Sequence, residues 1–128
     1  MSSFSVTFRS RPADDVLALD LVGELDAHTA GEFEAALEKA VGEGHVRLVV
    51  NGAGLLYVSS AGLGVFMAFV EGVRQRGGDL KIAALAPRVF AVFDLLGFPL
   101  IFDIQETEND AVARFLADAQ GPGDAPAL

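Results

Sequence analysis

Residues 55–64 (Leu-Leu-Tyr-Val-Ser-Ser-Ala-Gly-Leu-Gly) place two hydroxyls and two glycines where a strand and loop give way to a helix. The apolar spacing between Val65 and Val73 predicts this helix from about Ser60 to Arg76. The first N–H groups of a helix have no intrahelical partner and carry partial positive charge. A phosphate on Ser60 would therefore find hydrogen-bond donors at once. Serine is also a preferred N-cap residue, so a plain capping role for Ser60 is the alternative.

Gly62 and Gly64 lie near the start of the predicted helix, where glycine is unfavourable. Each glycine costs a helix about 1 kcal/mol relative to alanine. The cost is explained if the backbone of a partner must approach closely. It is equally explained if this turn packs tightly against the sheet.

Other patterns that could support catalysis or cofactor binding are incomplete. Residues 52–54 (Gly-Ala-Gly) follow a strand, but Tyr57 stands where the third glycine of a dinucleotide-binding motif belongs. The chain has no Gly-Lys-Ser/Thr sequence, and the neighbours of Ser60 do not form the Gly-x-Ser-x-Gly of serine hydrolases. It has no cysteine and only His28 and His45, which excludes thiolate and histidine-rich metal sites. We therefore expect no catalytic residue, cofactor or metal.

The rest of the chain supplies the elements that must position the two serines. Polar and apolar residues alternate over residues 4–9, and an apolar run at 16–22 follows a turn, so these two segments predict a β-hairpin. Residues 46–51 form a β-branched run typical of a central strand covered on both faces. Apolar runs at 80–85 and 100–104 predict two further strands. The helical segments between strands imply a mostly parallel sheet with helical crossovers.

Four helices are expected. Thr29 and Glu32 predict a capping box at the start of the first. The buried stripe of this helix is predicted to be Phe33, Ala36, Leu37, Ala40 and Val41. The second helix follows the two serines. The third lies between Pro87 and Gly97, and the fourth begins near Thr107.

The third helix carries more apolar residues than one buried face can hold. Its core-facing residues are predicted to be Val89, Val92, Phe93 and Leu96. Phe90 and Leu95 fall outside that face, and Met67 lies off the buried stripe of the second helix. Phe90 and Met67 are therefore candidate contacts for a partner, with burial beneath a neighbouring element as the alternative.

Composition limits the class of partner. The 128 residues fit one domain, which we assign to residues 1–119, and residues 120–128 have the composition of a disordered tail. The net charge of −9 disfavours nucleic acid and anionic membranes, so a protein or cationic surface is the expected partner. No apolar stretch approaches the roughly 20 residues of a membrane span, and the N-terminus does not resemble a signal peptide. We expect no membrane insertion and a cytoplasmic location.

Two stretches together resemble one family. Residues 21–29 (Leu-Val-Gly-Glu-Leu-Asp-Ala-His-Thr) and the stretch at 55–64 are similar to the STAS domain, most closely to the free-standing anti-sigma factor antagonists of bacteria. The order of predicted elements from about residue 4 to 118 is also similar to that fold. The resemblance implies an α/β, STAS-like single domain with a mixed, mostly parallel sheet of about five strands and about four helices.

The resemblance also implies a partner-switching cycle. An anti-sigma factor with serine kinase activity would phosphorylate Ser60 and release the protein, and a serine phosphatase of the metal-dependent type would restore binding. Asp26 matches the acidic residue of the neighbouring loop in the family. The binding surface implied by the resemblance and the helix patterns consists of Asp26, Ser59, Ser60, Ala61, Gly62, Leu63, Gly64, Met67 and Phe90.

The sequence departs from the usual family pattern at three positions. The modified serine commonly follows an aspartate and precedes a second Ser or Thr, whereas Ser59 and Ala61 flank Ser60. Ser59 is therefore a second candidate for phosphorylation. Asn51 stands where an aspartate is common after the third strand. A STAS subunit of a transport complex of the lipid ABC type, or of a scaffold complex, in which Ser60 only caps its helix, is the alternative function.

Overall fold

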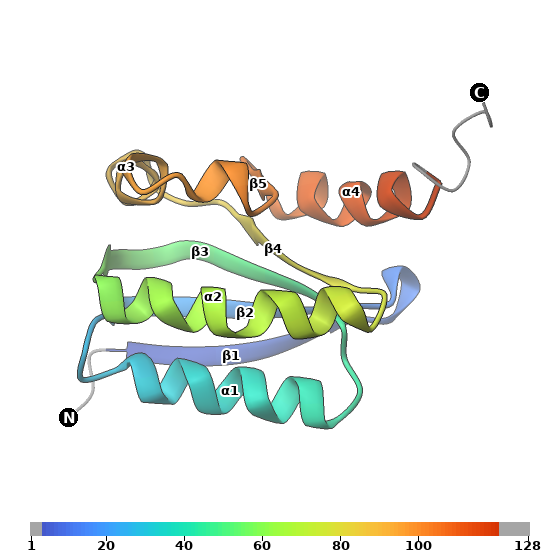
Figure 1. Ribbon diagram of the computed structural model, residues 1–128, viewed down its shortest axis with the longest axis horizontal. Coiled ribbons are helices and arrows are strands. Elements are labelled where there is room, and N and C mark those ends of the chain that lie inside the picture. The colour runs from blue at the N-terminus through green and yellow to red at the C-terminus, as the bar shows by residue number, and fades with distance from the viewer. Residues whose placement is uncertain (1–3, 121–128) are drawn as a thin grey trace.

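The computed structural model describes residues 4–120, so the predicted tail at 120–128 lies outside the described residues except for its first residue. Figure 1 shows how the strands and helices alternate along the chain. Their order is β1 (Phe4–Arg11), the 3-10 turn η1 (Pro12–Asp14), β2 (Val16–Leu25), α1 (Ala30–Gly42), β3 (Arg47–Val58), α2 (Ser60–Gln75), β4 (Asp79–Ala83), α3 (Pro87–Leu95), the 3-10 turn η2 (Phe98–Leu100), β5 (Ile104–Gln105) and α4 (Glu108–Gln120).

The five strands form one sheet in the order β1-β2-β3-β4-β5. β1 and β2 pair antiparallel as a hairpin, and each later pair is parallel. The crossover helices α1, α2 and α3 each carry the chain back to the end of the sheet at which the next parallel strand begins. The predicted α/β fold, with a mixed and mostly parallel sheet and four helices, is confirmed.

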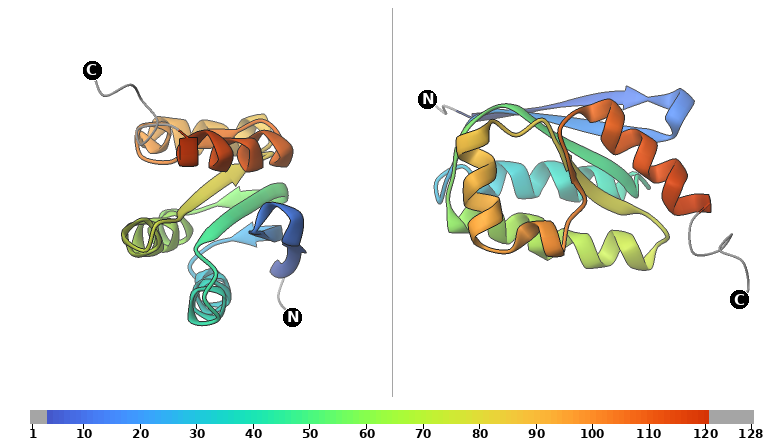
Figure 2. Two further views of the ribbon diagram at one scale, coloured as in Figure 1. Left: turned by 90° about the vertical axis from the view of Figure 1, so that its right-hand side faces the viewer. Right: turned by 90° about the horizontal axis from the view of Figure 1, so that it is seen from above.

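Helices cover both faces of the sheet (Figures 1 and 2). α1 and α2 lie side by side against one face, where their apolar stripes meet the inward side chains of the strands in one large core. Phe66 of α2 lies at the centre of that core, with its ring centroid 4.9 Å from Phe33 and 5.6 Å from Phe93 of α3. α4 covers the opposite face through a smaller cluster that includes Val49 and Phe115. Since β3 ends at Val58 and α2 begins at Ser60, the start of α2 lies at the end of the sheet where β3 finishes.

The predicted strand at 100–104 is wrong for most of its length. Residues 98–100 form the turn η2, and only Ile104 and Gln105 pair with β4. Phe98 and Phe102 are both buried, and their rings stack with centroids 5.0 Å apart. In an extended strand, residues four apart are separated by about 13 Å, whereas in a helical turn they are neighbours, so stacking of the two rings requires a turn.

The third predicted strand is longer than expected. It continues from Arg47 through the glycines at 52–54 to Val58 because β2 pairs with it in parallel as far as Leu25, with two irregularities in the register. In α3 the predicted burial of Leu96 is wrong, since the helix ends one residue earlier and leaves this side chain 57% exposed. Phe90 and Leu95, which the sequence leaves either exposed or buried beneath a neighbouring element, are 37% and 84% exposed.

Candidate functional site

The two serines lie at the edge of the sheet where β2 and β3 both end. Leu25 pairs with Val58 at the last position of the parallel ladder, and the Ser59 N–H donates to the Leu25 carbonyl at 2.9 Å. Carboxyl ends of neighbouring parallel strands meet at one edge, which is where ligands of α/β sheets commonly bind. Asp26 and Ser59, each one residue beyond its strand, are brought together in this way.

Ser60 is the first residue of α2, and its side chain is exposed. The N-cap is Ser59, with an extended backbone at φ −103° and ψ 173°. The first backbone bond of the helix runs from the Leu63 N–H to the Ser59 carbonyl at 3.0 Å. The N–H groups of Ser60, Ala61 and Gly62 precede it and have no intrahelical acceptor. The helix therefore presents three donors next to an accessible hydroxyl.

The Ser59 hydroxyl is arranged differently. It makes no cap hydrogen bond to α2, and its Oγ is buried with no hydrogen-bond partner within the described part of the chain. A serine N-cap normally satisfies one of the free N–H groups of the first turn. Because Ser59 does not, those N–H groups are left available. Sequence reasoning missed this arrangement, since a serine in the N-cap position ordinarily predicts a capped helix.

Asp26 is held by a tight hydrogen-bonded loop. Its Oδ1 accepts the His28 N–H at 2.9 Å and the Thr29 N–H at 3.1 Å. The Thr29 hydroxyl donates to the Glu24 carbonyl at 2.8 Å and accepts the Asp26 N–H at 2.9 Å. The N–H of His28, together with the groups of Thr29, holds the pKa of Asp26 below its usual range. The loop therefore carries a negative charge at neutral pH.

The same contacts show that the predicted capping box at Thr29 is wrong. Thr29 occupies the N-cap position of α1, but its side chain makes no cap hydrogen bond to the helix. Its hydroxyl instead points back to the strand end and stabilises the loop that carries Asp26. An Asp followed three residues later by Thr is a sequence signal for such a turn, and it was available without the structure.

The two glycines of the junction have different surroundings. A Cβ on Gly62 would lie 2.5 Å from the Leu25 Cγ and 3.1 Å from the Leu25 carbonyl, so this glycine lets α2 pack against the end of β2. A Cβ on Gly64 would meet nothing within 4 Å. Tight packing inside the domain explains Gly62, while Gly64 faces open space.

Some of the remaining predicted contact residues share one surface, and others lie elsewhere. Ser60, Gly64 and Met67 follow one exposed side of α2, and Ala61 is exposed beside them. Leu63 is 4% exposed and packs into the core, so its side chain does not reach the surface. Phe90 lines a separate cavity of about 330 Å³ beside β5.

The described residues contain neither a candidate metal cluster nor a candidate membrane-spanning helix. Between residues 4 and 120, no three His, Cys, Asp or Glu side chains cluster in a way that could hold a metal ion. Over the same range no helix has both the length and the apolar character to cross a bilayer.

The fold and the site define a class of α/β proteins in which a mixed sheet presents the start of its second helix at the carboxyl edge. The chain belongs to the STAS domain family, whose sequence profile matches residues 8–111. It is 35% identical over 102 residues to BtrV of Bordetella bronchiseptica, a protein assigned as an anti-sigma factor antagonist, covering 80% of this chain and 88% of BtrV. It is 30% identical over 108 residues to the anti-sigma-B factor antagonist of Listeria monocytogenes, covering 84% of this chain and 94% of that protein.

A solved structure has the same fold. The unphosphorylated form of the anti-sigma factor antagonist SpoIIAA superimposes with a TM-score of 0.71 at 23% identity, covering 89% of this chain and 96% of SpoIIAA. A phosphorylated form of the Bacillus SpoIIAA also superimposes, with a TM-score of 0.63 at 22% identity, covering 87% of this chain and 97% of that chain.

Proposed function

We propose that the protein is an anti-sigma factor antagonist that binds an anti-sigma factor while Ser60 is unmodified and is released when Ser60 is phosphorylated. The observation that carries this proposal is the start of α2, where an exposed serine hydroxyl adjoins three N–H groups without intrahelical acceptors. The names of the BtrV and Listeria relatives support the antagonist function. The two forms of SpoIIAA support phosphorylation as a feature of proteins with this fold.

Burial favours Ser60 over Ser59 as the modified residue. A kinase must bring the γ-phosphate of ATP to the serine oxygen, and the Oγ of Ser59 is enclosed in the unmodified protein. The Ser60 side chain is exposed. Ser60 is also not the N-cap of α2, so the capping role considered for it in a transport subunit does not apply.

The switch follows from charge. A phosphate adds about −1.5 to −2 charges at neutral pH. The N–H groups at the start of α2 stabilise it without refolding. For a partner already seated on this surface, however, the new charge brings desolvation cost and steric conflict. It also stands near the charged Asp26 and so strengthens the negative potential that a partner must match.

The partners that complete this cycle are an anti-sigma factor with serine kinase activity and a metal-dependent serine phosphatase, all acting in the cytoplasm. The surface for the kinase comprises Asp26 and the exposed side of α2 from Ser60 through Gly64 to Met67. The protein itself acts as a binding module with no catalytic residue of its own.

The proposal is tested with kinase-type anti-sigma factors encoded in the same genome. Purified Ser60→Ala is expected to bind one of them as tightly as the unmodified protein, and Ser60→Asp to bind at least about tenfold more weakly. Ser59→Ala is the matched control and should still be phosphorylated when ATP is added. Equal binding by Ser60→Ala and Ser60→Asp would contradict the proposal.

A second measurement separates this function from that of a transport subunit. Protein isolated from growing cells is analysed by intact mass and site mapping. Phosphate on Ser60 that disappears after phosphatase treatment supports the switch. Absence of phosphate under every growth condition, together with recovery in a membrane transport complex, would favour the transport alternative.

A further inference from the structure

Within the described residues 4–120, β1 forms an edge of the sheet, because it pairs with β2 on one side only. All eight of its residues are in register with β2, with no irregularity. Its first five residues, Phe-Ser-Val-Thr-Phe, contain no charge and no proline. Natural edge strands usually carry bulges, prolines or inward-pointing charges that prevent another strand from pairing with them. This half of β1 has none of those protections.

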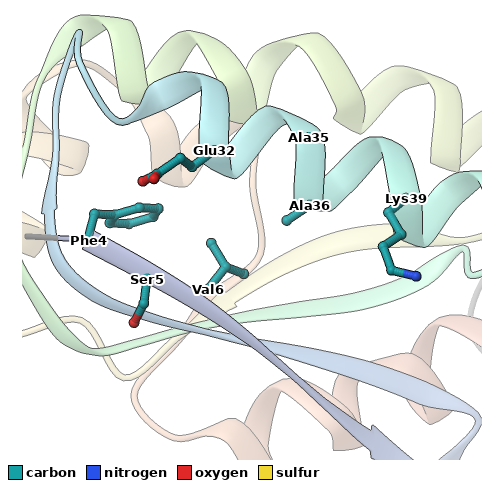
Figure 3. A pocket seen from close by; sticks show the side chains of 7 residues that line it. All are labelled: Phe4, Ser5, Val6, Glu32, Ala35, Ala36 and Lys39. Carbon is teal, nitrogen blue, oxygen red and sulfur yellow. The ribbon is translucent and has the colours of Figure 1, made fainter. Parts of the chain in front are cut away.

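A groove runs between this edge and α1, with a volume of about 340 Å³ (Figure 3). Phe4 and Val6 line it from β1, and Ala35 and Ala36 line it from α1. Because the two alanines are small, α1 leaves space beside the strand. Phe8 continues the row of Phe4 and Val6 along the strand and is still 36% exposed. Phe4 itself is only 5% exposed, so the accessible part of the edge lies from Ser5 to Phe8.

We propose that this edge pairs with β1 of a second copy of the same chain, antiparallel, about a two-fold axis at Val6. This register places Phe4 of each copy opposite Phe8 of the other and Val6 opposite Val6. Aromatic pairs directly opposite each other stabilise antiparallel strands. The exposed part of Phe8 is covered, and the sheet becomes continuous across the two copies. Each copy uses the same surface, as a two-fold interface requires.

The charges on α1 favour a second copy as the occupant. Glu32 and Lys39 stand at opposite ends of the groove, with Ala35 and Ala36 between them (Figure 3). A two-fold axis at the middle of this stripe brings Lys39 of each copy towards Glu32 of the other. The salt bridge that Lys39 makes with Glu43 on its own helix is exposed and contributes little to stability, so Lys39 can also contact a second carboxylate. The surface is thus complementary to itself in charge as well as in shape.

The residues that meet across this pairing carry no charge. The chain has a net charge of −9, so most of the surface of another copy would be repelled. Arg9 and Arg11 of β1 are ion-paired with acidic residues of the same chain. Between Phe4 and Phe8 the strand has neither an acidic nor a basic side chain, so the ladder itself adds no like-charge contact.

The proposed contact comprises a short ladder and one helix pair, whereas a standard stable interface covers roughly 800 Å² per partner. Dimerisation is therefore expected to depend on concentration. Sedimentation equilibrium of the full chain should give a mass that rises from 13.4 kDa towards twice that value as concentration increases. A mass of 13.4 kDa at all concentrations would overturn the proposal and leave the edge to a strand of another protein.

The register is tested with a single cysteine, since the native chain has none. Val6→Cys should be cross-linked to a dimer by a short bifunctional thiol reagent, because the two-fold axis places both thiols together. Ala117→Cys, on the exposed side of α4, is the control and should stay monomeric. Equal cross-linking of the two variants would contradict the pairing.

A charge exchange tests the helix pair. Lys39→Glu should weaken the dimer about tenfold, because two attractive contacts become repulsive. The double variant Glu32→Lys/Lys39→Glu has the native net charge and should restore dimerisation. Arg88→Glu changes net charge equally, away from the groove, and should weaken it less. A double variant as weak as Lys39→Glu would refute the arrangement. Ser60→Ala should dimerise normally, so this test is independent of the phosphorylation switch.

Discussion

Glu108, at the start of α4, joins the strands β1 and β3 to the helix that covers the outer face of the sheet. Its carboxylate accepts hydrogen bonds from Arg9, from Arg11 at 2.8 Å and from Asn51 at 3.0 Å, and its side chain is only 12% exposed. The hydrogen bond from Arg9 is the main cause that lowers the pKa of Glu108 from 4.5 to about 2. We predict that Glu108→Gln destabilises the protein at neutral pH and much less in acid.

The magnitude follows from that pKa. A fall from 4.5 to about 2 corresponds to roughly 3 kcal/mol of folding free energy. Water screens Arg9, whose side chain is 44% exposed, so about 2 kcal/mol is the expected loss at pH 7. A carboxylate with a lowered folded pKa stabilises the protein fully above the unfolded pKa. This contribution is lost as the pH falls from 4.5 towards 2, and under about 1 kcal/mol should remain at pH 3.

The assay is urea unfolding of the native chain and Glu108→Gln at pH 7 and at pH 3, followed by circular dichroism. The difference between the two proteins isolates Glu108 from the other acidic residues that titrate in this range. Glu106→Gln, which removes an exposed carboxylate two residues away, is the control and should change stability by less than about 0.5 kcal/mol at either pH. A difference between the native chain and Glu108→Gln that is the same at pH 7 and pH 3 would refute the role assigned to this carboxylate.

Two further substitutions follow from the same packing. Asn51→Asp should destabilise the protein by about 1–3 kcal/mol at pH 7, because a carboxylate would replace the amide that donates to Glu108, and the loss in urea unfolding should shrink below pH 4. Unchanged stability would mean that this hydrogen bond is not formed. Gly62→Ala should destabilise by about 1–3 kcal/mol through the clash with Leu25, whereas Gly64→Ala should raise the melting temperature by removing about 0.5–1 kcal/mol of helix penalty. Equal effects at the two glycines would show that close packing does not distinguish them.

Much of the fold was predictable because its signals are local. Alternation in β1 and the helical spacing of α1 and α2 each reflect one buried face, and the β-branched run in β3 reflects a strand covered on both faces. Each of these predictions is confirmed. The turn at η2 was not predictable in this way. Its two phenylalanines fit either a short strand or a helical turn. Only their packing against Phe66 from a distant helix decides between these.

The candidate site was likewise predictable only in part. The sequence by itself determined that two serines stand where a strand gives way to a helix, because helix periodicity and strand composition are visible along the chain. Only the tertiary structure decided that Ser59 is enclosed while Ser60 is accessible, since Leu25 of β2 must first pair with β3 and accept the Ser59 N–H. It likewise decided that Gly62 serves the packing of α2 on β2. Burial and close approach depend on residues far apart in the chain, and no local pattern records them.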